Sequence, residues 1–367
     1  MRHLASVQRV SDIRPIEGRD RIEQCRINGW NVIIKKGEFD EGDLAVYVEI
    51  DSVLPEQPEY EFLRPKKFRI RTMKMAGVLS EGICFPLTVL PAREEPYVLG
   101  EDVTSLMGVT KYEPQDAEEK TLAPASPKKT LMERLPLMRF RWYRRLFGST
   151  QKRRGGFPDE VPKTDETRIQ NMPFILDDKK TEWVATEKID GTSATYLLRR
   201  HRRFLLPDHF EFVVCSRNMN LAKGNSVYWE IAEKFGIEQM LRNIIAMDDW
   251  VAVQGEIIGP KIQGNKYGRT EPDFYAFNLL RPNGGRQSWR RSSSINGQYT
   301  LQEYGIKWVP ILDCGFILPD TVDEVLQMAH GDSEIGDTLR EGIVFRSTDG
   351  VRSFKAVDPD FLIHYNI

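Results

Sequence analysis

Short apolar runs closed by glycine or charged residues dominate the second half of this chain. Between residues 181 and 358, seven such runs have the length and composition of β-strands: 181–189, 193–200, 210–217, 250–258, 273–280, 341–347 and 352–358. Helical patterns intervene at 226–246 and 321–330, and Asp320 and Asp323 open the second in a near capping-box arrangement. This alternation predicts an α+β domain over residues 161–367.

The first 110 residues read as all-β. The runs "NVIIKKG" and "LAVYVEI" flank the turn-rich "EFDEGD", and "GVLSEGICFPL" supplies another strand pair. Apolar residues alternate with small or polar ones from Leu44 to Ile50, which is the period of a half-buried strand. Short strands at this density predict a small barrel.

Positive charge is concentrated in two segments, although the net charge is only -2. The first, "LRPKKFRIRTMKM", interleaves cations with Phe68, a combination typical of nucleic-acid contacts. Its candidate contact residues are Lys66, Lys67, Arg69 and Arg71. The second lies in a connector at 111–160, which is rich in proline and charge. That segment is either a solvated basic face or a second phosphate contact.

Composition excludes several classes of protein. No apolar run approaches the ~20 residues that span a bilayer, and no signal core is seen, so we expect an intracellular, cytoplasmic protein without membrane contact. Cys25, Cys84, Cys215 and Cys314 lie far apart in the sequence and form no CxxC pair. We therefore expect four core thiols rather than a zinc site or a disulfide framework.

Six polar-ended segments follow one another in a fixed order. They are "EKIDGTS" (187–193), "SRN" (216–218), "GEIIG" (255–259), "FYAFNLL" (274–280), "EGIVFR" (341–346) and "SFKAV" (353–357). The "KIDG" stretch alone is weak evidence of function because so short a motif occurs by chance, whereas the ordered set of six segments is strong evidence. The set resembles the nucleotidyltransferase motifs of the ATP-dependent ligase and mRNA-capping superfamily. The amino-acid sequences of these motifs, with "KTDETRIQN" upstream, are most similar to those of RNA ligases.

The resemblance covers residues 161–358 closely and residues 1–110 loosely. It implies the nick-sealing type of RNA ligase, with an OB-fold nucleic-acid-binding module at 1–110, a connector at 111–160 and an adenylyltransferase domain at 161–367. The implied fold class is α+β. An OB-like β-barrel precedes an ATP-grasp-like ligase domain of antiparallel sheets with flanking helices.

By this resemblance Lys188 is the nucleophile that attacks the α-phosphate of ATP and becomes lysyl-AMP. Because a free lysine has a pKa of about 10.4, we expect burial and nearby cations to lower it. Lys355, a metal ion and Arg168 are the expected sources of that positive charge. Glu341 and Glu256 are expected to hold Mg²⁺ or Mn²⁺. Gly191 is expected to permit the tight turn that presents the lysine.

Further residues are assigned to the nucleotide and the nucleic acid on the same ground. Glu187 is expected to read the adenine amino group, Glu256 and Arg217 to contact the ribose or phosphate, and Ser193, with Thr192, to lie near the terminal nucleotide. Phe277 is expected to stack on adenine, with Phe274 competing for that role. Asp190 either caps the turn or supports the site.

One position departs from the superfamily pattern. Where many members have a lysine two residues before Lys355, this chain has Ser353. Arg352 and Arg346 are the candidates to replace the missing charge.

The leading hypothesis is an ATP-dependent RNA ligase that acts on an RNA-containing nicked duplex with an RNA 3′-hydroxyl strand and needs no obligate protein partner. The alternatives are a DNA ligase or a capping-type nucleotidyltransferase. Both usually place an OB-fold after the last motif, where this chain has only twelve residues beyond Lys355. A non-catalytic RNA-binding protein is the third alternative, and it would be expected to lack Lys188, Glu256 or Glu341.

Overall fold

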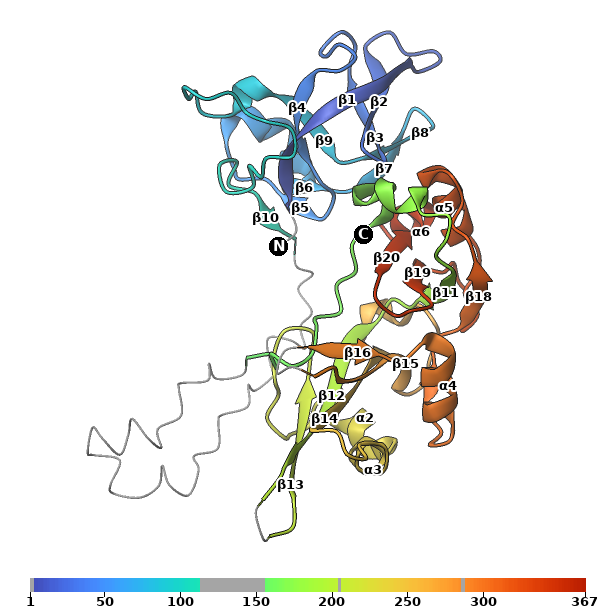
Figure 1. Ribbon diagram of the computed structural model, residues 1–367. Coiled ribbons are helices and arrows are strands. Elements are labelled where there is room, and N and C mark those ends of the chain that lie inside the picture. The colour runs from blue at the N-terminus through green and yellow to red at the C-terminus, as the bar shows by residue number, and fades with distance from the viewer. Residues whose placement is uncertain (1–2, 113–155, 204–205, 285–287) are drawn as a thin grey trace, which may run out of the picture.

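Two β-rich lobes make up the described part of the chain. The computed structural model describes residues 3–112, 156–203, 206–284 and 288–367. The amino-terminal lobe lies at the top of Figure 1 in blue and cyan, and the carboxy-terminal lobe lies below it in green to red. The predicted connector falls almost entirely on residues 113–155, outside the described residues.

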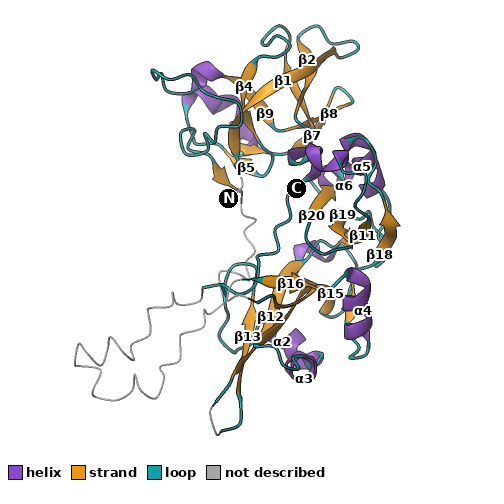
Figure 2. Cartoon of the chain, in the orientation of Figure 1, coloured by secondary structure: helices purple, strands orange, loops and turns teal. Residues whose placement is uncertain are grey.

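A five-stranded antiparallel sheet is the main element of the amino-terminal lobe. Its order is β3–β2–β1–β4–β9 (Figure 2), and β3 and β9 are edge strands, so the sheet is an open half-barrel. Its strands are β1 (Ala5–Pro15), β2 (Ile22–Ile27), β3 (Trp30–Lys35), β4 (Leu44–Val48) and β9 (Ile83–Pro86). Beside it lie a three-stranded sheet of β5 (Ser52–Val53), β6 (Arg69–Ile70) and β10 (Thr110–Lys111) and a hairpin of β7 (Thr72–Met75) and β8 (Val78–Glu81).

Strand β4 is buried on both faces, so the prediction of a half-buried strand is wrong. Ala45 and Tyr47, on the face predicted to be outside, are as buried as Val46 on the other face. The Tyr47 ring packs over Gly82, where a Cβ atom would lie 2.4 Å from the ring. Its hydroxyl donates a hydrogen bond to the Glu81 carbonyl at 2.8 Å, so the β8–β9 turn covers this second face.

Two largely antiparallel sheets form the carboxy-terminal lobe. The first has the order β18–β11–β19–β20 and the second the order β13–β12–β14–β15–β16, with β17 parallel to β15. All seven predicted runs are strands: β11 (Trp183–Lys188), β12 (Thr192–His201), β13 (His209–Cys215), β14 (Trp250–Ile258), β15 (Asp273–Pro282), β19 (Gly342–Ser347) and β20 (Ser353–Val357). The strands not predicted are β16 (Trp289–Arg291), β17 (Lys307–Trp308) and β18 (Ile311–Phe316).

Five α-helices flank these sheets in the described residues: α2 (Val227–Lys234), α3 (Ile237–Ile244), α4 (Ser294–Gln302), α5 (Val322–Ala329) and α6 (Pro359–His364). The single helix predicted over 226–246 is two helices, because Gly236 between them adopts a left-handed φ of 58°. Helix α5 has a capping box formed by Thr321 and Glu324, so the predicted cap at Asp320 and Asp323 was misplaced by one residue. None of the described helices is both long and apolar enough to cross a membrane.

The two lobes share a hydrophobic core. Val357 at the end of β20 and Phe361 and Leu362 of α6 belong to the same buried cluster as the core of the amino-terminal lobe. Figure 1 shows α5 and α6 directly below that lobe. Polar contacts reinforce the junction: Asn171 accepts the Trp30 indole N–H at 2.6 Å and donates to Glu49 at 2.7 Å.

Three of the four cysteines are buried, as expected for core thiols. Cys314 is the exception, because it lies on β18, the edge strand of its sheet, and is exposed.

Candidate active site

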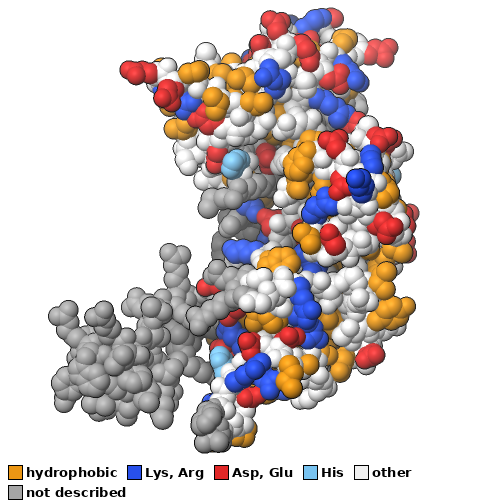
Figure 3. Space-filling model, in the orientation of Figure 1, with side chains coloured by type: hydrophobic (Ala, Val, Ile, Leu, Met, Phe, Trp, Pro, Cys, Tyr) orange, Lys and Arg blue, Asp and Glu red, His pale blue; other side chains and the backbone are white. Residues whose placement is uncertain are grey.

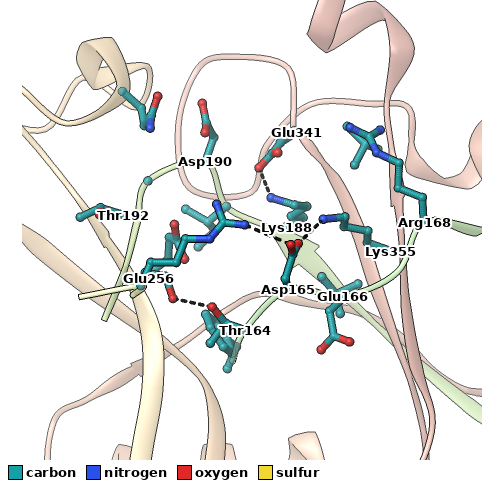
Figure 4. A pocket seen from close by; sticks show the side chains of 18 of the residues that line it. Thr164, Asp165, Glu166, Arg168, Lys188, Asp190, Thr192, Glu256, Glu341 and Lys355 are labelled. Carbon is teal, nitrogen blue, oxygen red and sulfur yellow. Dashed lines mark hydrogen bonds and ion pairs between the residues drawn. The ribbon is translucent and has the colours of Figure 1, made fainter. Parts of the chain in front are cut away.

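A cavity of about 320 Å³ is lined by residues of both lobes. Figure 3 shows the surface hollowed between the lobes on this side, and Figure 4 shows the cavity at close range. The cavity brings together most of the predicted residues: Lys188, Lys355, Glu341, Glu187, Arg217, Glu256, Phe277, Arg168, Ser193 and Arg69. Lys66, Lys67 and Arg71 lie outside it.

Lys188 ends strand β11 and reaches into the cavity. Its Nζ donates a hydrogen bond to Glu341 Oε2 at 2.5 Å. The two residues are close because Glu341 immediately precedes β19, and β19 pairs with β11. Burial opposes the charge on the amine, but the carboxylates of Glu341, Glu256 and Asp190 outweigh it and raise the pKa of Lys188. The expected lowering of this pKa is therefore wrong, because carboxylates rather than cations are the strongest charged neighbours of Lys188.

Two of these carboxyl groups are strongly perturbed. Burial raises the pKa of Glu256 to about 8, with Lys188 opposing the shift and Glu341 adding to it. Burial also raises the pKa of Asp190 to about 6, against the attraction of Lys266. Asp190 forms an ion pair with Lys266, so it supports the site rather than capping the turn. The raised proton affinities of Glu256 and Asp190, and the carboxylate of Glu341 in the same cavity, suit a divalent cation.

Asp165 organises the cations on the opposite side of Lys188. Its carboxylate contacts Lys355 Nζ at 3.0 Å, Arg217 at 3.3 Å and Lys111 of the amino-terminal lobe at 3.4 Å. Burial opposes the charge on Asp165, but these cations prevail and hold its pKa well below the usual range. The sequence analysis missed this residue, although the segment "KTDETRIQN" that contains it had been singled out.

The pKa of Lys355 is shifted in the opposite direction to that of Lys188. Burial lowers the pKa of Lys355 to about 8, assisted by the neighbouring Lys188 and Arg168 and opposed by Asp165. Figure 4 shows the amines of Lys188 and Lys355 converging on one region of the cavity. The cavity therefore contains two amines of different proton affinity.

Aromatic residues separate into core and cavity along strand β15. Phe274 is completely buried, and a Cβ atom on Gly255 would lie 2.4 Å from its ring. Phe277 is only partly buried and lines the cavity. Of the two phenylalanines, Phe277 is therefore the one whose ring is accessible from the cavity. Glu187 also lines the cavity, and its carboxylate accepts hydrogen bonds from Ser333 and the Glu334 amide.

Of the two candidates to replace the charge missing at Ser353, only Arg346 lines the cavity. Arg346 is buried in the cavity wall and donates to Thr186 Oγ1 at 3.1 Å. Arg352 pairs with Asp178 at 2.7 Å and does not line the cavity. Ser353 itself donates to Glu166 at 2.5 Å.

The amino-terminal lobe adds its own charges to the cavity. Arg69 stacks over the Tyr112 ring at 3.5 Å, and both residues line the cavity with Lys111 and Asp51. Arg168 from the other lobe meets Asp51 at 3.3 Å, so the predicted phosphate contact is also a bridge between the lobes.

The basic stretch at 63–75 is largely engaged in contacts within the protein. Arg71 donates to the carbonyl and side chain of Asn366, and Lys74 pairs with Asp360 at 2.7 Å. Lys66 lies 3.4 Å from the Met73 sulfur and Lys67 is exposed. Part of the stretch predicted to contact nucleic acid is thus a surface that joins the lobes. Ser193 lies apart from this stretch and contacts Thr164 Oγ1 at 2.8 Å.

Comparisons with known proteins agree with this arrangement. Residues 4–87 match a family model described as an OB-fold domain, and residues 181–357 match the RNA ligase family. A comparison with curated proteins gave no match.

Solved structures of an RNA ligase from Naegleria gruberi resemble the whole chain. The form with pyrophosphate is 32% identical, with a TM-score of 0.77, and covers 99% of this chain and 98% of its own. Two substituted forms with ATP and Mn are 30% and 31% identical, with TM-scores of 0.76 and 0.79, and each covers 98% of both chains. The predictions of an RNA ligase and of an OB-fold are thereby confirmed, and the chain belongs to the RNA ligase family, with an OB-fold domain at its amino-terminal end.

Proposed function

We propose that the protein is an ATP-dependent RNA ligase that works through a covalent lysyl-AMP on Lys188. The enzyme first transfers AMP from ATP to the lysine, then to an RNA 5′-phosphate, and a 3′-hydroxyl finally displaces the AMP. The observation that supports this most is the buried Lys188 amine, held by Glu341 in a cavity that also contains Lys355.

In the first step the Lys188 nitrogen attacks the α-phosphorus of ATP. A nitrogen–phosphorus bond forms, the bond to the bridging oxygen breaks, and pyrophosphate leaves. The amine must lose a proton before attack, and Glu341 Oε2 is the nearest acceptor, at 2.5 Å. Lys355 and Arg217, which Asp165 orients, supply positive charge for the phosphate oxygens.

Glu341, Glu256 and Asp190 are the residues that would hold Mg²⁺ or Mn²⁺. A divalent cation would neutralise these carboxylates and so remove the interaction that raises the Lys188 pKa. The solved relatives with ATP and Mn support the assignment of ATP and a divalent metal as cofactors.

The nucleoside would lie on the Phe277 side of the cavity. The partly exposed ring of Phe277 would stack on adenine, and Glu256 and Arg217, which line the same cavity, would contact the ribose or phosphate. Glu187 remains a proposed reader of the adenine amino group, and Arg168 a proposed phosphate contact.

The division of labour between domains is part of the proposal. Residues 161–367 would carry out nucleotidyl transfer, and residues 1–110 would bind nucleic acid. Arg69 and Lys111 reach the same cavity, so the OB-fold domain would also contribute charge to phosphates there.

The substrate we propose is a nicked duplex whose 3′-hydroxyl strand ends in ribonucleotides. Thr192 and Ser193 follow the nucleophile on β12, and their hydroxyls contact Tyr228 and Thr164 near the cavity. A terminal 2′-hydroxyl offers both a donor and an acceptor to such groups. All-DNA nicks should then stall in the last step, with adenylated strand accumulating.

Labelled ATP and Mg²⁺ test the proposal. The wild-type protein should retain label as a covalent adduct, Lys188→Ala should lose it, and Lys180→Ala, an exposed lysine on the same approach to β11, should keep it. An adduct on Lys188→Ala would refute the assignment. Two nicked duplexes that differ only in terminal ribonucleotides test the substrate, and equal sealing rates would refute the RNA preference.

A further inference from the structure

A second cavity, of about 180 Å³, lies behind the wall that Arg346 forms. It is lined by the end of β16, the start of α4 and the β19–β20 turn. Figure 1 shows β16 next to that turn, and Gly350 in the turn is close to the Arg291 carbonyl. A single water needs only ~10–15 Å³, so the space accommodates a larger group. Arg346 lines this cavity as well as the first one.

Two buried arginines face this space with one carboxylate between them. The side chains of Arg291 and Arg346 are 6% and 5% exposed, and both approach the same Glu166 oxygen, at 3.9 and 3.8 Å. The other Glu166 oxygen accepts the Ser353 hydroxyl. One positive charge is therefore left without a matching negative charge in a buried place, which is costly unless an anion completes the set.

The hydrogen-bond donors of these residues are also incomplete. Arg291 Nε and Nη1 and Arg346 Nε have no hydrogen-bond partner in the described part of the chain. The buried hydroxyl of Ser294, which lines the cavity, has none either. The unpaired guanidinium N–H groups are held in a fixed plane, which is the geometry in which arginine binds phosphate oxygens.

The start of helix α4 adds backbone donors at the same place. Ser293 caps the helix by accepting the Asn296 amide. The amides of Ser294 and Ile295, in the first turn, have no acceptor within the helix, and both residues line the cavity. The positive end of the helix dipole favours an anion there.

From this convergence we infer that the second cavity binds a phosphate group, held by Arg291, the Ser294 hydroxyl and the amino-terminal end of α4. The phosphate would come either from the backbone of a bound RNA strand or from free inorganic phosphate. Because Arg346 forms the partition, a bound phosphate would compete with Glu166 for this arginine and couple the second cavity to the first.

Inorganic phosphate is the probe. The measurement is the increase in the unfolding midpoint when phosphate is added at constant ionic strength. Arg291→Gln removes the buried cation, and Ile295→Glu places a carboxylate at the cavity from a 40% exposed position, which keeps the fold intact. Arg290→Gln, on the exposed face of the same strand, is the matched control. We expect the wild type and the control to gain the same phosphate-dependent rise, and the two cavity variants to lose at least half of it.

The remaining rise in the cavity variants would report phosphate bound in the first cavity. A wild-type phosphate response in both Arg291→Gln and Ile295→Glu would overturn the inference. If Arg291→Gln is unstable without phosphate, Ile295→Glu alone decides. The test uses neither ATP nor strand joining. A negative result would therefore refute the phosphate site without affecting the proposed ligase activity.

A second arm identifies the source of the phosphate. Binding of a 5′-hydroxyl RNA oligonucleotide is measured for the same four proteins, with and without inorganic phosphate. Several-fold weaker RNA binding by both cavity variants, together with competition by phosphate in the wild type, identifies an RNA phosphodiester. Equal RNA binding by all four, with the phosphate response lost in the cavity variants, identifies free phosphate.

Discussion

Charges far apart in the sequence determine the chemistry of individual residues here. The pKa of Lys188 rises because Glu341, Glu256 and Asp190 converge on it from separate segments, whereas at Lys355 burial prevails over the attraction of Asp165 and lowers the pKa. The residue types at these positions were predictable from the ordered motifs. The direction of the Lys188 shift was not, because it depends on which partners are within a few ångströms after folding.

Glu81 gives a prediction at the same scale. This carboxyl is completely buried in the OB-fold domain, and burial raises its pKa to about 7, against the attraction of Arg168. The folded protein therefore holds this proton more tightly than the unfolded chain, so stability is lost as pH rises from about 4.5 to about 7 and stays low above it. We expect Glu81→Gln to be more stable than the wild type at pH 8, by roughly 2–3 kcal/mol.

Denaturant unfolding at pH 4.5 and pH 8 measures this effect. The advantage of Glu81→Gln should shrink to a few tenths of a kcal/mol at the lower pH, where the carboxyl is protonated in the folded protein and about half protonated in the unfolded chain. Glu94→Gln, an exposed position in the same domain, should show no such dependence. A gain that is the same at both pH values would contradict the explanation.

At the scale of elements, strands were predicted more completely than the contacts between them. Alternating or continuous apolar runs identify β11, β12 and β14 without any knowledge of their neighbours. The strands β16, β17 and β18 were missed because their pairing, rather than their composition, makes them strands. Asp165 and Lys266 were missed for a similar reason, since each gains its role only from partners on other segments.

Gly191 illustrates how a correct residue was given a wrong reason. Its backbone does not adopt a positive φ, so freedom in the turn is not what the position needs. A Cβ atom there would lie 2.3 Å from the Ile257 carbonyl and 2.9 Å from Glu256 Cγ. The glycine lets the start of β12 approach β14 closely enough to bring Glu256 to Lys188.

We therefore expect Gly191→Ala to lower the rate of enzyme adenylylation at least tenfold, because the strands must separate and Glu256 must move. Gly224→Ala is the matched control, since no atom lies within 4 Å of its added Cβ atom and its φ is not positive. Single-turnover adduct formation compares the two variants. Equal rates for Gly191→Ala and the wild type would show that the strand spacing does not position the site.

At the scale of the whole molecule, the two domains are less separable than the motifs imply. All the nucleotide motifs lie beyond residue 155, which predicts that a fragment from there to the end keeps some adenylyl transfer. In the structure, however, Phe361 and Leu362 are buried in the core of the OB-fold domain. Removal of residues 1–110 would expose both side chains to water. Loss of activity in that fragment could then result from unfolding as well as from the missing substrate-binding surface.

Asn171 allows the junction to be loosened in the full chain instead. Its side chain links Trp30 and Glu49 of the OB-fold domain, and Asn171→Ala removes both hydrogen bonds. Loss of a partner to buried polar groups costs about 1–3 kcal/mol. We expect a lower unfolding midpoint and at least tenfold slower adduct formation at saturating ATP, because Arg69 and Lys111 would no longer be held in the cavity.

Asn243→Ala is the matched control for this variant, because Asn243 is exposed on α3 and its side chain accepts only a local hydrogen bond, from Gln239. It should behave as the wild type in both measurements. The two readouts on Asn171→Ala separate docking from catalysis, since activity is measured well below the unfolding midpoint. A destabilised Asn171→Ala that forms the adduct at the wild-type rate would show that the OB-fold domain stabilises the chain without contributing to nucleotidyl transfer.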